Sequence, residues 1–180
     1  MEGRAWLLRC TAASDTLWTR TLTLDGLNTK GTCVTVTGDE GYVLGGSAET
    51  PAGDRNALLS RWTSDGELVW TTPYGGAADD ELRDVLTCAS GGYSAVGVTA
   101  SYSDWTEAYH LRVDEAGGQL WYRNWGQIND QESQEHTELT DGTFVTIGYT
   151  KTSGGGGKDM FLLKSATDGD FVYGRTFGGL

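Results

Sequence analysis

Acidic and aromatic residues gather in the longer polar segments of this sequence, and this combination is the first candidate for chemistry. Carboxylates beside aromatic rings would suit a cation, a sugar with its apolar ring face, or a basic protein segment. The alternative is that these segments are solvated loops whose aromatic side chains only support turns. The candidate ligand-binding residues are Tyr74, Asp79, Asp80, Tyr102, Asp104, Trp105, Trp125 and Asp130.

Catalytic and metal-binding patterns are weaker. Catalysis by carboxylates needs unlike groups at a fixed separation, and the many similar acids show no evident pair. The two histidines, His110 and His136, have no link in the sequence, so neither a zinc site nor a catalytic triad is predicted. A calcium ion bound by Asp79, Asp80 and Asp84 stays an open alternative, although no calcium-loop motif surrounds these residues. No other cofactor and no catalytic residue is predicted.

The overall charge limits the partners that the chain could bind. Its 25 acidic and 13 basic residues give a formal net charge of -12. Such a chain would repel a phosphate backbone, so nucleic acid is not an expected partner. No stretch reaches the roughly 18 apolar residues of a membrane-spanning helix. The three cysteines show no CxxC spacing and are predicted to be small buried hydrophobic residues.

A repeat of about 50 residues must position these side chains. One marker is an aromatic residue at intervals of 52, 51 and 52 residues, at Trp18, Trp70, Trp121 and Tyr173. A second marker is a glycine at intervals of 51 residues, at Gly46, Gly97 and Gly148. A third is a cation nine residues before each aromatic, at Arg9, Arg61, Arg112 and Lys164. Three independent markers with one period indicate a true structural repeat.

Each full period contains four short runs rich in Val, Thr, Tyr and Trp, without a long 3.6-residue pattern. These runs predict β-strands rather than helices. One four-stranded sheet per period, stacked on its neighbours, is typical of a β-propeller blade. We therefore predict an all-β chain, a β-propeller of four-stranded antiparallel blades with about 3.5 blades here. The predicted units are a half blade at 1–26 and full blades at 27–76, 77–127 and 128–180.

Turn signals predict how the last two strands of each blade pair. The dipeptides Asp65-Gly66 and Asp168-Gly169 favour two-residue hairpins with type I′ turns. Residues paired across such a hairpin have numbers with a constant sum, which puts Arg61 opposite Trp70. The same arithmetic pairs Arg9 with Trp18, Arg112 with Trp121, and Lys164 with Tyr173. A cation over each aromatic ring would then clamp the blade edge, which we favour over a ligand site.

The connections between the predicted strands differ in length on the two faces of the blades. One face has short turns, whereas the other has long and varied loops at 49–56, 73–81, 100–107, 124–132 and 151–159. Loops longer than a connection requires are where binding usually occurs. The candidate ligand-binding residues belong to this second face, and Trp105 is the strongest of them because no core is expected near it.

Several segments resemble a known group of repeats. The sequences "GGYSAVGVTAS", "KDMFLLKSATDGDFVYGRTFGG" and "YGGAADDEL" are similar to the propeller repeats of about 50 residues found in many bacterial and archaeal secreted proteins. A fainter likeness extends to kelch and quinoprotein propellers. The resemblance implies a propeller, often extracellular or at the cell surface, without an assigned ligand. The second full repeat departs from the pattern at "EAYHLRV" and "NWGQ", and the Ala-x-Asp element of quinoproteins is missing, so no quinone is implied.

About 3.5 blades cannot surround an axis, because propellers usually close with four to eight. We expect closure by a second copy of the chain, giving six or eight blades, or by further blades of a longer chain. The function expected is a non-enzymatic binding or scaffold module with an acidic, aromatic loop face. A carbohydrate-active hydrolase or lyase and a purely structural spacer are the alternatives.

Overall fold

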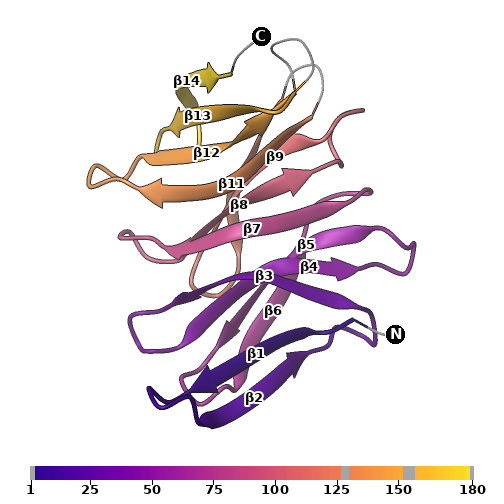
Figure 1. The fold of residues 1–180 in the computed structure, drawn as a ribbon, viewed down its shortest axis with the longest axis vertical. Coiled ribbons are helices and arrows are strands. Elements are labelled where there is room, and N and C mark those ends of the chain that lie inside the picture. Colours follow the sequence, from indigo (N-terminus) through magenta and orange to yellow (C-terminus); the bar gives the residue numbers. More distant parts are fainter. Residues whose placement is uncertain (1–2, 127–129, 152–156, 179–180) are drawn as a thin grey trace.

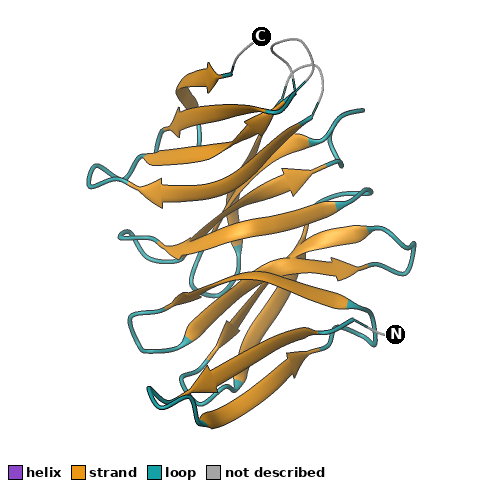
Figure 2. Cartoon of the chain, viewed as in Figure 1, coloured by secondary structure: helices purple, strands orange, loops and turns teal. Residues whose placement is uncertain are grey.

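The computed structural model describes residues 3–126, 130–151 and 157–178, and this part of the chain folds into fourteen β-strands (Figure 1). Loops and turns alone connect the strands in the described segments (Figure 2), where no helix is long and apolar enough to cross a membrane. The N-terminal hairpin consists of β1 (Ala5–Cys10) and β2 (Thr16–Leu22). The first sheet consists of β3 (Thr29–Val36), β4 (Tyr42–Glu49), β5 (Arg55–Trp62) and β6 (Leu68–Tyr74).

Two further sheets follow in chain order. The second sheet consists of β7 (Asp80–Thr87), β8 (Tyr93–Thr99), β9 (Glu107–Val113) and β10 (Gln119–Trp125). The third consists of β11 (Gln131–Glu138), β12 (Phe144–Thr150), β13 (Asp159–Ser165) and β14 (Phe171–Phe177). Each sheet is an antiparallel meander, and Figure 1 shows the sheets stacked one on another. The predicted all-β class and the four-stranded antiparallel sheets are thus confirmed.

The predicted register is also confirmed, although the turn type is different. Arg61 lies opposite Trp70, and the other three predicted pairs form as well. In the turn between β5 and β6, the Thr63 carbonyl accepts a hydrogen bond from Gly66 N at 3.0 Å. Of the two residues Asp65 and Gly66, only Gly66 has a positive φ, of 76°. This is a type I turn with a bulge at glycine, which needs one left-handed residue where type I′ needs two. The bulge takes up the extra residue, so the pairs beyond it keep the predicted register.

The paired cations do not lie on the aromatic rings, which corrects the predicted clamp. The guanidinium of Arg61 donates to the Asp39 carboxylate at 2.6 Å and to the Tyr93 hydroxyl at 3.1 Å. The guanidinium of Arg112 donates to the Gly91 carbonyl at the turn between β7 and β8. A guanidinium has five N–H donors, and oxygen atoms at a turn satisfy more of them than a ring face can. Arg61 and Arg112 therefore hold the hairpin between the first two strands of their own sheets, whereas Arg9 donates to the Ser64 carbonyl in the following sheet.

The repeated aromatic residues support the next sheet along the chain. Three tryptophan rings lie against turn glycines of the following sheet, Trp18 at Gly66, Trp70 at Gly117 and Trp121 at Gly169. A Cβ added at Gly117 would lie 3.0 Å from the Trp70 ring. The cation contacts of these rings come from a different arginine, since Arg20 lies 5.4 Å from the Trp18 ring centroid and Arg123 lies 5.7 Å from that of Trp121.

The repeated glycines mark a bulge in the first strand of each sheet. Register shifts occur in β3, β7 and β11, opposite Gly46, Gly97 and Gly148. At each bulge a backbone carbonyl approaches the glycine, and a Cβ added at Gly97 would lie 2.0 Å from the Glu81 oxygen. Only glycine leaves room for this approach.

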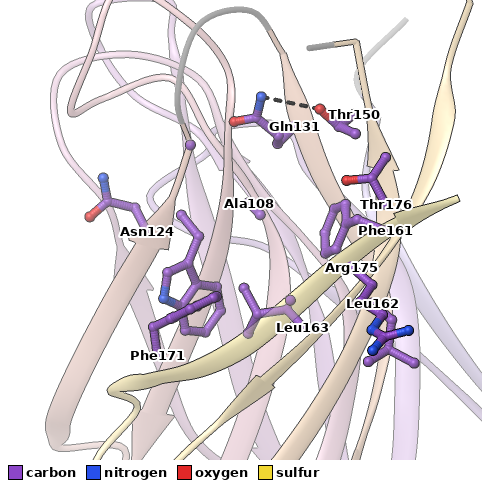
Figure 3. A pocket seen from close by; sticks show the side chains of 13 residues that line it. Ala108, Asn124, Gln131, Thr150, Phe161, Leu162, Leu163, Phe171, Arg175 and Thr176 are labelled. Atoms are coloured by element: carbon purple, nitrogen blue, oxygen red, sulfur yellow. Dashed lines mark hydrogen bonds between the residues drawn. The ribbon is translucent and has the colours of Figure 1, made fainter. Parts of the chain in front are cut away.

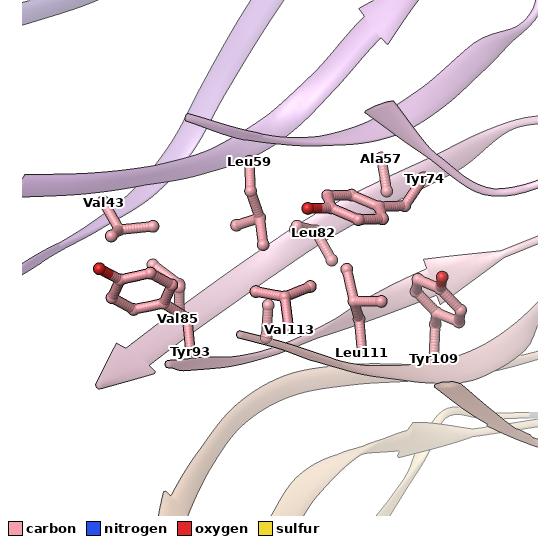
Figure 4. Close-up of a cluster of buried hydrophobic side chains, with 11 residues drawn as sticks. Val43, Ala57, Leu59, Tyr74, Leu82, Val85, Tyr93, Tyr109, Leu111 and Val113 are labelled. Atoms are coloured by element: carbon pink, nitrogen blue, oxygen red, sulfur yellow. The ribbon is translucent and has the colours of Figure 1, made fainter. Parts of the chain in front are cut away.

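The core lies between the sheets. We call the packing of the first sheet on the second the first interface, and that of the second sheet on the third the second interface. The first interface is an apolar cluster formed by Val43, Ala57, Leu59, Tyr74, Leu82, Val85, Tyr93, Ala95, Tyr109, Leu111 and Val113 (Figure 4). The second interface has a much smaller apolar cluster, formed by Ala108, Phe161 and Leu163 with Trp125 against them.

Candidate functional site

The eight residues selected from the sequence do not form one continuous surface. Asp80, the first residue of β7, is only 1% exposed. Its Oδ2 accepts hydrogen bonds from Ser101 Oγ at 2.8 Å and from Gly76 N at 3.0 Å. Burial raises the pKa of Asp80 in spite of these hydrogen bonds. The carboxylate therefore fastens the connection between β6 and β7 to the loop after β8.

Tyr102 lies close to Asp80 and belongs to a group of tyrosines. Its ring stacks on Tyr122 with the centroids 5.0 Å apart, and Tyr109 lies beside both rings. Burial, with Tyr122 and Asp80 nearby, raises the pKa of Tyr102 to about 12. Tyr74 is buried and donates from its hydroxyl to the Gly117 carbonyl at 2.7 Å. Tyr74 and Tyr109 are therefore buried packing residues, whereas Tyr102 is 38% exposed.

Of the other acidic candidates, Asp79 is next to Asp80, and its charge contributes to the raised pKa of Asp80. Asp79 Oδ1 accepts from Arg55 N at 2.9 Å, and Asp130 Oδ2 accepts from Lys151 Nζ at 2.5 Å. Asp104 and Trp105 are exposed, with 45% of Trp105 accessible to solvent. The described residues contain no group of three or more His, Cys, Asp or Glu that could hold a metal ion.

Trp125 is the candidate that lies in a cavity. A pocket of about 560 Å³ opens between the second and third sheets at the end of β10 (Figure 3). Its aromatic walls are Trp125, Phe161 and Phe171, and its polar side chains are Asn124, Gln131, Thr150, Arg175 and Thr176. Gln131 donates to Thr150 Oγ1 at 3.3 Å on one side of the pocket. No carboxylate is among the described residues that line this pocket, although the Glu107 carboxylate accepts a hydrogen bond from Asn124 in its wall. The pocket thus differs from the acidic loop surface expected from the sequence.

Sequence reasoning missed the part of the pocket that the third sheet supplies. Phe161, Phe171 and Arg175 lie on β13 and β14, where the strand pattern indicated only sheet packing. The one sequence feature that pointed to the pocket was the long connection after Trp125, which placed this ring at the end of a strand. Part of that connection, residues 127–129, lies outside the described residues, as do 152–156 of the last long loop.

A buried polar relay crosses the second interface behind this pocket. Asp84 on β7 accepts at Oδ2 from His136 Nδ1 at 2.8 Å and from His136 N at 3.0 Å. His136 Nε2 lies 2.9 Å from Ser94 Oγ, and Ser94 Oγ lies 2.6 Å from His110 Nε2. Ser94 and His110 are 0% exposed, and so is the His136 side chain. The two histidines that the sequence left unlinked are therefore joined through Ser94.

The relay has the atom order of a serine nucleophile activated by histidine and aspartate, but it cannot act as one in this arrangement. A substrate carbonyl would have to reach Ser94 Oγ. That oxygen is fully buried and lies between the rings of His110 and His136. The arrangement therefore joins two sheets and is not a catalytic triad open to substrate.

The environment of the relay favours an uncharged His110. Its ring has edge contacts with Trp121, Trp125 and Phe144 at centroid distances of 4.9, 5.5 and 5.0 Å. Burial, with the charges of His136 and Arg112, lowers the pKa of His110 well below its ordinary value. Burial alone would raise the pKa of Asp84, but the hydrogen bonds from His136 lower it.

The chain matches no model of a protein family, and no curated protein matches it.

Proposed function

We propose that this chain is a segment of a β-propeller that serves as a binding module, and that its pocket beside Trp125 binds a saccharide. The propeller proposal is supported by the stack of antiparallel meanders and by the contact of β3 with β7 and of β7 with β11. In a propeller these would be the inner strands of successive blades. The repeat resemblance, which implies an extracellular or cell-surface propeller, is a further part of this proposal.

The observation that carries the saccharide proposal is the composition of the pocket. Aromatic rings stack on the apolar face of a sugar, and amide and hydroxyl groups bond its hydroxyls. The pocket combines Trp125 and Phe171 with the amides of Asn124 and Gln131, which also donate to Glu107 and Thr150. Arg175 is its one charged lining residue among those described. A basic protein segment is less well matched because none of the described lining residues is a carboxylate. Asp80 and Asp130, the acids considered for a hydrolase, are engaged by Ser101 and Lys151.

A glycan array followed by titration calorimetry tests the saccharide proposal. We expect Trp125→Ala to lower the affinity for a bound glycan at least tenfold, since it removes the stacking ring. Trp105→Ala is the matched control, because Trp105 is exposed on a loop and does not line the pocket. Arg175→Ala, on the exposed strand β14, gives a second pocket variant with little risk to folding. Binding that survives Trp125→Ala but not Trp105→Ala would contradict the proposal, and so would an array without any hit.

We also propose that two copies associate through the open faces of their end sheets. The third sheet exposes Met160, Tyr173 and Phe177, which are 50, 47 and 47% accessible to solvent. The corresponding residues of the first sheet are Ala57, Trp70 and Tyr74, and these pack on the following sheet. On β1, Trp6 and Leu8 are 57 and 40% exposed, at the positions of Tyr109 and Leu111, which pack on the preceding sheet. The two open faces are therefore complementary halves of one type of interface.

Light scattering across a hundredfold dilution tests this association. We expect a mass of about 39 kDa, twice the 19.3 kDa of one chain, falling to that of a monomer in Met160→Glu. Val69→Glu is the control, because Val69 is 56% exposed but belongs to neither open face. A folded monomer at every concentration would contradict the proposal.

A further inference from the structure

The second interface contains one feature that the saccharide proposal does not use, the relay of Asp84, His136, Ser94 and His110. Its proton positions are restricted by the number of donors and acceptors. With both histidines neutral, His136 Nδ1–H donates to Asp84, Ser94 Oγ–H donates to His136 Nε2, and His110 Nε2–H donates to Ser94. His110 Nδ1 is then a bare ring nitrogen, and it has no hydrogen-bond partner in the described structure.

An added proton disturbs this arrangement wherever it binds. On His110 it would occupy Nδ1 and create a buried N–H, on a charged ring, without an acceptor. On His136 it would turn Nε2 into a donor to Ser94, so the Ser94 hydroxyl hydrogen would lose its acceptor on that ring. The hydroxyl would then either donate to His110 Nε2, which moves the His110 hydrogen to Nδ1, or accept from both rings and leave its own hydrogen without an acceptor in the relay. Every protonated form of the relay therefore lacks one hydrogen bond.

The charged groups around the relay do not supply the missing acceptor. They are Asp84 on β7, Arg112 on β9, Arg123 on β10, and Glu135 and Glu138 on β11. Asp84 Oδ2 already accepts from His136, and Arg123 pairs with Asp170 at 2.9 Å. Glu138 accepts from Ala89 N at 2.7 Å, and Glu135 is exposed. Neither β8 nor β12 carries a carboxylate, an imidazole or a cation.

The relay is also in contact with the pocket wall. The His110 ring lies 5.5 Å from the Trp125 ring, which lines the pocket, and Ala108 on the same strand lines it too. Phe144, on the third sheet, packs on His110 from the other side at 5.0 Å. A change in the protonation of the relay therefore acts on the packing of the second sheet against the third.

We infer that the relay makes the second interface sensitive to acid, so that the third sheet loosens from the second and the pocket changes shape as the pH falls. This inference does not depend on what the pocket binds. The chain has two histidines, and both belong to the relay, so a titration between pH 5 and 8 has few other possible sources. The lowered pKa of His110 agrees with this direction, because the folded interface resists the proton that an open one would accept.

Fluorine NMR of the chain labelled with 5-fluorotryptophan tests the inference. We expect the Trp121 and Trp125 signals, assigned with Trp→Phe variants, to shift or broaden progressively as the pH falls from about 6.5 towards 5. Trp70 is the internal control, because it occupies the position of Trp121 in the apolar first interface. A four-residue variant carries Asp84→Cys, Ser94→Val, His110→Leu and His136→Val, so that each position has the residue found at the corresponding position of the first interface. In this variant all tryptophan signals should stay constant.

Two results would overturn the inference. One is that Trp121 and Trp125 stay constant down to pH 5 in the natural sequence, and the other is that they move equally in the four-residue variant. If that variant does not fold, the NMR signals of the His110 and His136 rings are followed against pH in the natural sequence. A ring signal that changes over the same pH range as the Trp125 signal supports the inference. Rings that titrate with no change at Trp125 would refute it. Failure of the glycan tests would leave this result unaffected.

Discussion

The two interfaces between the full sheets occupy the same repeat positions but are built from opposite kinds of side chain. Cys33, Val43 and Leu59 of the first sheet correspond to Asp84, Ser94 and His110 of the second. On the facing sheets, Val85 corresponds to His136. At these positions the first interface places apolar side chains, whereas the second joins the sheets through hydrogen bonds between side chains.

This difference shows that the repeat sets the backbone but leaves the chemistry of each interface free. Both interfaces have the bulge opposite a glycine and a tryptophan under a turn of the next sheet. Apolar packing stabilises sheets over a wide pH range, whereas a buried hydrogen-bonded network depends on every member keeping its protonation state. The packing of the second interface should therefore depend more strongly on pH than that of the first.

The largest effect is expected from placing a relay residue in the apolar interface. Leu59→His would bury an imidazole among Val43, Val85 and Ala95 without a partner, and it should lower the free energy of unfolding by about 3 kcal/mol or more. Urea unfolding at pH 7.5 measures this loss. The matched control is Leu59→Met, which keeps the site apolar and should lose less than about 1.5 kcal/mol. Equal losses in the two variants would show that shape alone, and not polarity, determines this interface.

Breaking the relay at one point should give the next largest effect. His136→Val removes the ring donor to Asp84 and one of the two ring partners of Ser94, while Asp84 keeps its backbone donors and Ser94 keeps His110. We expect a loss of about 2 kcal/mol in the free energy of unfolding, because the Asp84 side chain remains 27% exposed and can regain some water. The matched variant Val85→Ala in the first interface separates this effect from that of lost volume. A loss below 0.5 kcal/mol would mean that the relay does not hold the sheets together.

The sequence predicted the strands and their register because repeated residues have repeated backbone roles. The aromatic residues Trp18, Trp70 and Trp121 mark turns of successive sheets, and the glycines mark bulges, so a period in the sequence becomes a period in space. The predicted contact between each cation and its paired aromatic ring was wrong, because the pairing of two backbone positions does not determine where the end of a long side chain lies. Arg61 reaches past its paired ring to the Asp39 carboxylate.

The site was less predictable because it joins residues from different repeats. Ser94 meets His136 only when two sheets pack, and no local spacing indicates that contact. An alignment of the repeats with one another does carry the signal, since polar residues replace Val43, Leu59 and Val85 at corresponding positions in the next repeat. Trp125 was selected for its loop, whereas the pocket around it depends on Phe161 and Phe171 of the third sheet.

Converting the second interface into the first should have a smaller effect, of the opposite sign. The four-residue variant replaces a buried polar network with apolar side chains and should raise the free energy of unfolding by about 1 to 2 kcal/mol at pH 7.5. The pKa of His110 is lowered in the folded state, so the unfolded chain binds more protons below about pH 6.5. The stability of the natural sequence should therefore fall as the pH is lowered from 6.5, and the gain of the variant should grow. Urea midpoints between pH 5 and 7.5 check this, and parallel curves would contradict it.

The smallest effect concerns the thiol that corresponds to Asp84. Burial, with the charges of Asp84 and Glu81 as lesser causes, raises the pKa of Cys33 to about 12, and burial raises that of Cys88 to about 12 as well. Since only the thiolate reacts, iodoacetamide at pH 8 should modify the exposed Cys10 and leave the other two unmodified. Mass spectrometry should find one added group on the folded chain and three in urea, with little change in stability after the single modification. Rapid modification of Cys33 would mean that the apolar interface opens as readily as the polar one, and the contrast between them would be lost.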